Sequence, residues 1–210
     1  MIYFKFKRFY DFVLAVIGLI VLLPLFIIIM FLIKIDSKGP IFFKQKRVGR
    51  NKQHFYILKF RTMRIDSPKD TPTHMLNNPT QWITKMGKFL RRTSLDELPQ
   101  IINIIKGDMS IIGPRPALWN QYDLIKERDI YNVHRLYPGL TGYAQIHGRD
   151  ELPITEKAKL DGYYVKHINL ILDIKIFFGT IISIFKKEGI VEGGTGAIEK
   201  QKIDLERKYK

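Results

Sequence analysis

Cysteine is absent from this 210-residue chain. Its absence excludes disulfide frameworks, zinc sites built from thiolates, and cysteine nucleophiles. Negative charge is scarce, because 20 acidic residues face 35 basic residues, for a net charge of +15. Such an excess predicts a polyanionic partner, which composition alone leaves open between nucleic acid, an anionic membrane and a phosphorylated substrate. With 46% hydrophobic residues the chain can bury a core, so disorder throughout is excluded.

Charge is missing altogether from residues 12–33. As a helix this run would be roughly 33 Å long, enough to cross the hydrocarbon core of a bilayer. A buried helix of a soluble protein is the alternative, but such runs are usually shorter. A cleaved signal peptide is not expected, because the charged residues that follow provide no small-residue cleavage site. Most of the net positive charge lies in the first hundred residues, on both sides of this run, and that placement indicates a membrane surface.

Pro24 lies near the middle of the apolar run, where it removes one backbone hydrogen bond and bends a helix. A simple spanning helix carries positive charge on its cytoplasmic side only, whereas both flanks are basic here. The two observations favour a re-entrant helix–break–helix that enters and leaves by the same leaflet over residues 1–36. Residues 12–33 contain no Ser or Thr to satisfy the carbonyls freed by the proline, which counts weakly against this hairpin.

The remaining chain predicts short elements separated by turns. A basic strand pair is expected within 39–64, and helices over 83–92, 94–107, 117–131 and 152–165. Ser94 and Glu97 have the spacing of a capping box at the start of the second of these helices. Residues 168–185 predict an amphipathic helix, with equal weight for packing in the core and for lying on the membrane. Loops are expected at 66–81 and 138–149, and a solvated tail at the C-terminus.

The adjacent carboxylates Asp96 and Glu97 are the most informative pair in the sequence. Carboxylates at the start of a helix complement its dipole, and taken alone that explanation is the better one. Basic residues lie close by, among them Arg91 before the pair and Arg115 after it. A carboxylate among cations stays ionised, can bind a divalent metal, and can act as a nucleophile toward phosphorus. Both interpretations stay open from these residues alone.

Further basic residues stand in patterns suited to phosphate. Lys59 and Arg61 alternate at the end of the second predicted strand, which places them on the same side; a solvated basic strand edge is the alternative. Arg115 lies between two prolines, whose fixed φ suits a rigid guanidinium for bidentate phosphate recognition, and a plain loop is the alternative. Arg149 follows a glycine in a turn-rich loop, where exposed backbone N–H groups can also meet an anion.

Taken in order, these motifs resemble a known family. They are the apolar helix with its central proline, Lys59-Phe60-Arg61-Thr62-Met63, Thr93-Ser94-Leu95-Asp96-Glu97-Leu98-Pro99-Gln100, Gly107-Asp108-Met109-Ser110-Ile111-Ile112-Gly113-Pro114-Arg115-Pro116, and Pro138-Gly139-Leu140-Thr141-Gly142-Tyr143-Ala144-Gln145-Ile146-His147-Gly148-Arg149. The set is similar to the bacterial sugar transferases, specifically the small monotopic polyprenyl-phosphate phosphoglycosyl transferases. The resemblance runs from about residue 5 to residue 187.

This resemblance implies a reaction and roles for the residues. A sugar 1-phosphate passes from a UDP-sugar to undecaprenyl phosphate, and UMP is released. Asp96 is implied as the nucleophile that forms a phosphosugar–enzyme intermediate and as a Mg²⁺ contact, with Glu97 positioning the metal or assisting proton transfer. Lys59, Arg115 and Arg149 would hold phosphates, with Arg61 and Arg91 as further candidates. The family's usual serine before the proline is absent, because position 23 is a leucine.

The resemblance also sets expectations for architecture and location. The expected fold is α+β and mainly helical, with a re-entrant membrane helix–break–helix over 1–36, a catalytic domain with interfacial amphipathic helices over 37–187, and a flexible tail over 188–210. The catalytic domain is expected on the cytoplasmic face of the bacterial inner membrane, in contact with membrane lipids. An acetamido sugar, such as diacetylated bacillosamine, is expected on the donor. A membrane-tethered nucleic-acid-binding protein and a non-catalytic membrane scaffold are the alternatives.

Overall fold

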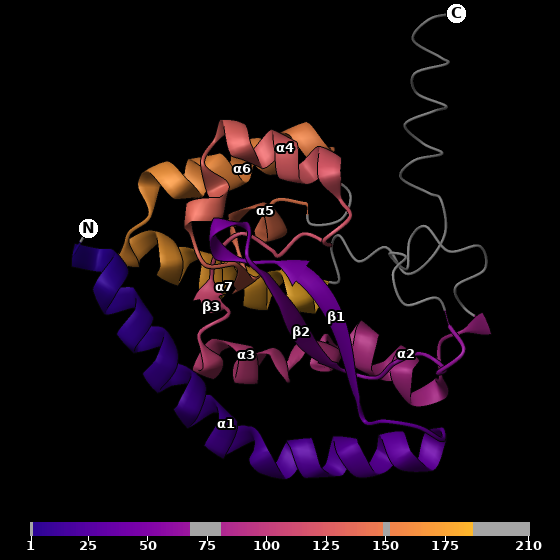
Figure 1. Ribbon diagram of the computed structural model, residues 1–210. Coiled ribbons are helices and arrows are strands. Elements are labelled where there is room, and N and C mark those ends of the chain that lie inside the picture. Colours follow the sequence, from indigo (N-terminus) through magenta and orange to yellow (C-terminus); the bar gives the residue numbers. More distant parts are fainter. Residues whose placement is uncertain (1, 68–80, 149–151, 187–210) are drawn as a thin grey trace, which may run out of the picture.

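The computed structural model describes residues 2–67, 81–148 and 152–186. The N-terminal segment forms one long helix, α1 (Ile2–Asp36), with Pro24 inside it. Figure 1 shows that α1 bends near its middle into two arms. α1 continues through Pro24, because the fixed φ of a proline is itself helical, so a break in the helix at this residue is not confirmed. Whether this bent helix follows a re-entrant path in a membrane stays a prediction.

Both arms of α1 pack on the same body of protein. In the first arm, Ala15 lies in a cluster with Ile104 and Met109. In the second arm, Phe26 and Ile33 lie in a cluster with Phe60 and Leu90. The division at residue 36 follows the end of α1, but the helix and the rest of the chain share these two cores.

The side of α1 turned away from the body is apolar and exposed. Ile20, Val21 and Phe31 are each between 67% and 69% exposed. The stretch Phe6–Asp36 is long and apolar enough, by length and composition, to cross a membrane. Because an apolar surface of this size is unfavourable in water, it marks the face that a membrane would cover.

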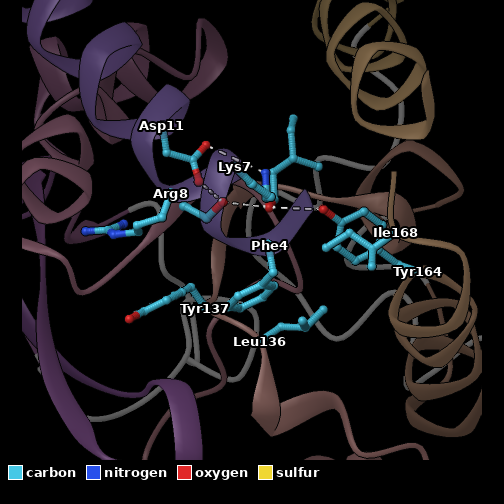
Figure 2. Close-up of a pocket in the computed structure, with 10 residues that line it drawn as sticks. Phe4, Lys7, Arg8, Asp11, Leu136, Tyr137, Tyr164 and Ile168 are labelled. Carbon is cyan, nitrogen blue, oxygen red and sulfur yellow. Dashed lines mark hydrogen bonds and ion pairs between the residues drawn. The ribbon is translucent and has the colours of Figure 1, made fainter. Parts of the chain in front are cut away.

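A buried polar network fastens the first turns of α1 to the C-terminal part of the fold. The ammonium of Lys7 is 2.7 Å from one carboxylate oxygen of Asp173, whose other oxygen accepts a hydrogen bond of 2.6 Å from the Tyr164 hydroxyl. Asp11 accepts a hydrogen bond of 2.5 Å from the Ser110 hydroxyl. Figure 2 shows Lys7, Asp11 and Tyr164 converging on one small cavity. Lys7 and Asp11 are therefore paired inside the protein.

The described residues also form two short strand pairs. β1 (Phe42–Val48) and β2 (His54–Phe60) form the expected antiparallel pair, in which Phe43 stands opposite Lys59. The segment between them contains one 3₁₀ turn, η1 (Arg50–Lys52). β3 (Ser110–Ile112) and β4 (Gly139–Thr141) form a parallel pair.

The loop expected over 138–149 is thus wrong in part, because it contains β4 and the short helix α5 (Tyr143–Ile146). Three-residue strands are too short to show an alternating pattern. Gly139 permits the pairing, since a Cβ there would lie 2.1 Å from the backbone nitrogen of Gly113.

The helices between the two strand pairs differ from expectation at their ends. α2 (Lys85–Arg92) forms as predicted, and it is followed by the 3₁₀ turn η4 (Leu95–Glu97) and by α3 (Gln100–Lys106). The capping box at Ser94 is wrong, because Ser94 has a left-handed backbone (φ 55°) and its side chain caps nothing. A capping side chain needs an extended backbone, as at Thr84, which accepts a hydrogen bond from the Gly87 nitrogen.

The C-terminal helices contact one another and the second strand pair (Figure 1). They are α4 (Tyr122–Ile130), the 3₁₀ turn η5 (Val133–Arg135), α6 (Ile154–His167) and α7 (Leu170–Lys186). α4 begins five residues later than expected, because Ala117 and Leu118 pair with β1 instead. The helix expected over 168–185 is confirmed as α7, in which Ile176 is fully buried. Its predicted apolar face does not pack in the core, because Ile171 and Phe178 on that face are 68% and 58% exposed. The fold is mainly helical with small strand pairs, as expected.

Candidate active site

Residues from three distant parts of the chain meet beside the Asp-Glu pair. Lys59 comes from the end of β2, Asp96 and Glu97 from η4, and Arg115 from the loop after β3. The side chains of the two carboxylates are 12% and 11% exposed, and those of Lys59 and Arg115 are 17% and 27% exposed. The sequence-based candidates Lys59, Asp96, Glu97 and Arg115 therefore form one half-buried, charged cluster.

Glu97 is held firmly by two cations. Its Oε1 is 2.7 Å from the Lys59 ammonium. Both carboxylate oxygens accept hydrogen bonds from the guanidinium of Arg115, at 3.1 Å and 2.5 Å. This bidentate geometry is the strongest form of an Arg–carboxylate contact. Glu97 is thus fixed in place with its oxygens already engaged.

Asp96 lies next to this pair without sharing its hydrogen bonds. Within the described residues, the nearest cation to its carboxylate is Lys59, at 3.8 Å from Oδ2, and no hydrogen bond to the carboxylate is present. Burial raises the pKa of Asp96, the Lys59 ammonium lowers it, and the charge of Glu97 raises it again. Of the two carboxylates, Asp96 is therefore the one whose oxygens are available to a reacting phosphorus or to a metal ion.

Burial also acts on the cation of the cluster. It lowers the pKa of Lys59, while the charges of Glu97 and Asp96 raise it. The two carboxylates therefore favour the charged form of Lys59 and oppose the effect of burial on its pKa.

The remaining predicted phosphate contacts have different positions. The Nε of Arg91 donates a hydrogen bond of 2.8 Å to the Thr62 hydroxyl, and the charge of Arg91 lowers the pKa of Asp96, so Arg91 lies at the edge of the cluster. Arg61 donates instead to the carbonyls of Lys38 and Ser37, at 2.6 Å and 2.8 Å, beyond the end of α1.

β2 ends at Phe60, and the guanidinium of Arg61 contacts the segment after α1, so the structure does not bring Arg61 to the Asp-Glu pair with Lys59. Arg61 holds the segment that follows α1. Arg149 lies outside the described residues.

Sequence reasoning missed the residues that support Arg115. Arg128, on α4, donates a hydrogen bond of 2.9 Å to the Arg115 carbonyl and pairs with Asp161 on α6. The signal in the sequence was weak, because an arginine inside a charged helix and an aspartate 33 positions later look like ordinary surface residues.

Comparison with known proteins identifies the family. A family model described as bacterial sugar transferase matches residues 2–187. The chain belongs to this family. The predicted family is confirmed, and with it the enzyme class.

Relatives of this sugar transferase include proteins of similar length and much longer ones. The exopolysaccharide production protein ExoY of Sinorhizobium fredii is 37% identical over 197 residues, which cover 87% of each chain. The UDP-glucose:undecaprenyl-phosphate glucose-1-phosphate transferases of Xanthomonas campestris and of Escherichia coli are each 40% identical, over 186 and 187 residues. These matches cover 85% of this chain but only 38% and 40% of those two proteins.

The described part of this sugar transferase offers few protein ligands for Mg²⁺. Within the described ranges, no group of three or more His, Asp or Glu residues could hold a metal ion. Mg²⁺ commonly uses one or two carboxylates and completes its shell with water and substrate phosphates. The carboxylate of Asp96 fits that mode of binding, because it lies beside a cationic cluster and accepts no hydrogen bond from the part of the chain that the structure describes.

Proposed function

We propose that this protein transfers a sugar 1-phosphate from a UDP-sugar to undecaprenyl phosphate and releases UMP. Membership of the sugar transferase family supports the reaction class. Three of the relatives have names that include undecaprenyl phosphate, and two of those names also include UDP-glucose. The protein would catalyse the first membrane step in the assembly of a glycan or glycoprotein.

One observation carries the proposed mechanism: the two neighbouring carboxylates have unequal surroundings. Glu97 is held by Lys59 and Arg115, whereas no residue that the structure describes makes a hydrogen bond to the carboxylate of Asp96. A nucleophile needs a free lone pair and a nearby positive charge that keeps it ionised. Asp96 meets both conditions, and Glu97 meets only the second.

The reaction then proceeds in two balanced displacements. An oxygen of Asp96 forms a bond to the phosphorus attached to the sugar, and the bond from that phosphorus to the oxygen of UMP breaks. In the second step an oxygen of undecaprenyl phosphate attacks the same phosphorus, and the bond to Asp96 breaks, which restores the carboxylate. Lys59 and Arg115 offset the charge that builds up on the phosphoryl oxygens.

Mg²⁺ is the proposed cofactor, held by Asp96 and by the phosphates of the donor. When bound, it supplies positive charge that stabilises the developing charge on the leaving phosphate. Glu97 is already occupied by two cations, so its role here is to position Lys59 and Arg115. Arg91 contributes positive potential at the edge of the site.

Two sugars are candidates for the donor. An acetamido sugar follows from the resemblance to small enzymes of this family. Glucose follows from the names of two relatives. A panel of UDP-sugars separates them, because the enzyme releases UMP only from donors whose sugar it accepts.

The contacts at both ends of α1 support the re-entrant path, and the basic residues on both flanks of its apolar run support a location on the cytoplasmic face of the inner membrane. Lys7 and Asp173 pair near one end, while Asp36 at the other end accepts a hydrogen bond from the Met86 nitrogen of α2. A helix that crossed the bilayer would separate its ends by about 30 Å of hydrocarbon. Since both ends contact one body through polar groups, they belong on one side of the membrane.

A UMP-release assay on membrane-embedded protein tests the proposal. We expect UMP release that requires Mg²⁺ and a UDP-sugar, with turnover beyond one equivalent only when undecaprenyl phosphate is present. Asp129→Asn, in an exposed ion pair with Lys52, is the control and should retain wild-type rates. A protein that releases no UMP from any UDP-sugar but binds DNA in a salt-dependent manner would support the nucleic-acid alternative instead.

A further inference from the structure

The loop that carries Arg115 has a dense set of backbone contacts. Four consecutive carbonyls, from Pro114 to Ala117, each accept a hydrogen bond from a different donor. The donors are the Gly139 nitrogen at 2.9 Å, Arg128 Nη1 at 2.9 Å, Arg47 Nη1 at 3.1 Å and the Val48 nitrogen at 2.9 Å, in chain order of the carbonyls.

Arg128 provides the contact to the carbonyl of Arg115 itself. Its side chain is only 4% exposed, and that of its partner Asp161 is 2% exposed. Nε and Nη2 of Arg128 donate to the same oxygen of Asp161, at 2.9 Å and 2.6 Å, which leaves Nη1 directed at the Arg115 carbonyl. The planar guanidinium therefore links α4, α6 and the Arg115 loop through fixed geometry.

We infer that Arg128, oriented by Asp161, is a positioning residue that sets the direction in which Arg115 presents its guanidinium to the phosphates of the donor. This inference rests on the proposed function. Arg115 stands between two prolines, so its own backbone has little freedom, and a bond to its carbonyl fixes the remaining rotation of the peptide unit. A misplacement of about 1 Å at a charged reacting site lowers the rate by up to about 100-fold.

A mere role in folding would give a different pattern of results. Removal of Arg128 alone would leave Asp161 buried without a partner, which destabilises a protein whatever its catalytic role. The paired replacement Arg128→Met with Asp161→Leu avoids this problem, because a buried ion pair exchanged for apolar residues of similar volume is often neutral for stability. The paired variant removes the hydrogen bond to the Arg115 carbonyl and keeps the packing of α4 on α6.

The experiment is a double-mutant cycle with Arg115→Ala. In the wild-type background we expect the paired variant to lower kcat/KM for the UDP-sugar about 10-fold to 100-fold, with a melting temperature close to that of the wild type. In the Arg115→Ala background the same pair of changes should alter kcat/KM by less than about twofold, because its effect acts through Arg115. Asp129→Asn, one position along α4, is the matched control.

Equal losses in the two backgrounds would overturn the inference, since they would show that Arg128 and Asp161 act independently of Arg115. If the paired variant does not fold, Arg128→Lys replaces it in the cycle. An ammonium can pair with Asp161 but cannot also reproduce the hydrogen bond of the guanidinium to the Arg115 carbonyl. The cycle is also run on the binding of UDP, measured by calorimetry. If the wild-type protein releases no UMP, the proposed function is refuted. If the paired variant and Arg115→Ala lower the affinity for UDP by additive amounts, the inference is refuted independently.

Discussion

Lys59→Met gives the most informative perturbation of the site, because one ammonium faces both carboxylates. It lies 2.7 Å from Glu97 and 3.8 Å from Asp96. At the longer distance, and with an effective dielectric constant of about 20, the attraction is about 4 kcal/mol. Arg115 still neutralises Glu97 in the variant, so the main loss falls on Asp96.

The direction of the effect follows from the pKa of Asp96. Burial already raises this pKa, and the Lys59 ammonium is the largest influence that lowers it. Without Lys59 the pKa rises further, the ionised fraction at neutral pH falls, and the acidic limb of the pH–rate profile moves to higher pH. Together with the lost stabilisation of the phosphoryl oxygens, we expect the first half-reaction to slow by on the order of 10² to 10³-fold at pH 7.

The assay is the burst of UMP from wild type, Lys59→Met and Lys59→Arg, measured without acceptor between about pH 5 and pH 10. In the wild type, the lowered pKa of Lys59 should shift the alkaline limb of the pH–rate profile to lower pH. Lys59→Arg should shift that limb to higher pH, because a guanidinium does not deprotonate in this range. Lys44→Met, exposed on the neighbouring strand, is the control. A Lys59→Met enzyme with a wild-type burst and an unmoved acidic limb would refute this reasoning.

Other predictions concern the supports of the site. Arg61→Ala should lower stability by about 1 to 3 kcal/mol in a denaturation experiment, since the carbonyls of Ser37 and Lys38 lose their donor, yet kcat should stay within about threefold of wild type. Lys7→Met should cost about 3 to 5 kcal/mol, because it leaves Asp173 buried without its cation; a melting temperature like that of the wild type would contradict the buried pairing of Lys7 with Asp173. Gly87→Ala should destabilise by about 1 to 3 kcal/mol, since a Cβ there would lie 2.0 Å from the Thr62 carbonyl oxygen, whereas Gly18→Ala, with open space around it, should not.

The sequence predicted elements with strong local signals and missed those defined by distant contacts. The helix over 168–185 and the strand pair that contains Lys59 have signals among neighbouring residues, so the presence of both elements was predicted correctly. The strand at Gly139 is defined by its pairing with β3, which lies far away in the sequence. The residues around Gly139 therefore do not predict this strand by themselves. The left-handed backbone of Ser94 likewise overrides a spacing that is typical of a helix cap.

The same distinction holds for the candidate site. The sequence indicated Asp96 and Glu97 through their adjacency, and it indicated Lys59 and Arg115 through basic patterns suited to phosphate; the family resemblance then assigned these residues their roles. The unequal surroundings of the two carboxylates depend on distances across 38 and 18 positions of the chain, which only the folded structure provides. Arg128 was not found because its partner lies on another helix.

The most direct test of the account is mass spectrometry of the protein after incubation with a UDP-sugar and Mg²⁺ in the absence of undecaprenyl phosphate. We expect the intact protein to gain the mass of one sugar phosphate, with the added mass on the peptide that contains Asp96, and to lose it when undecaprenyl phosphate is added. Asp96→Asn should gain nothing while Arg61→Ala is labelled like the wild type. Rapid turnover with no added mass, or label on a peptide without Asp96, would contradict the account.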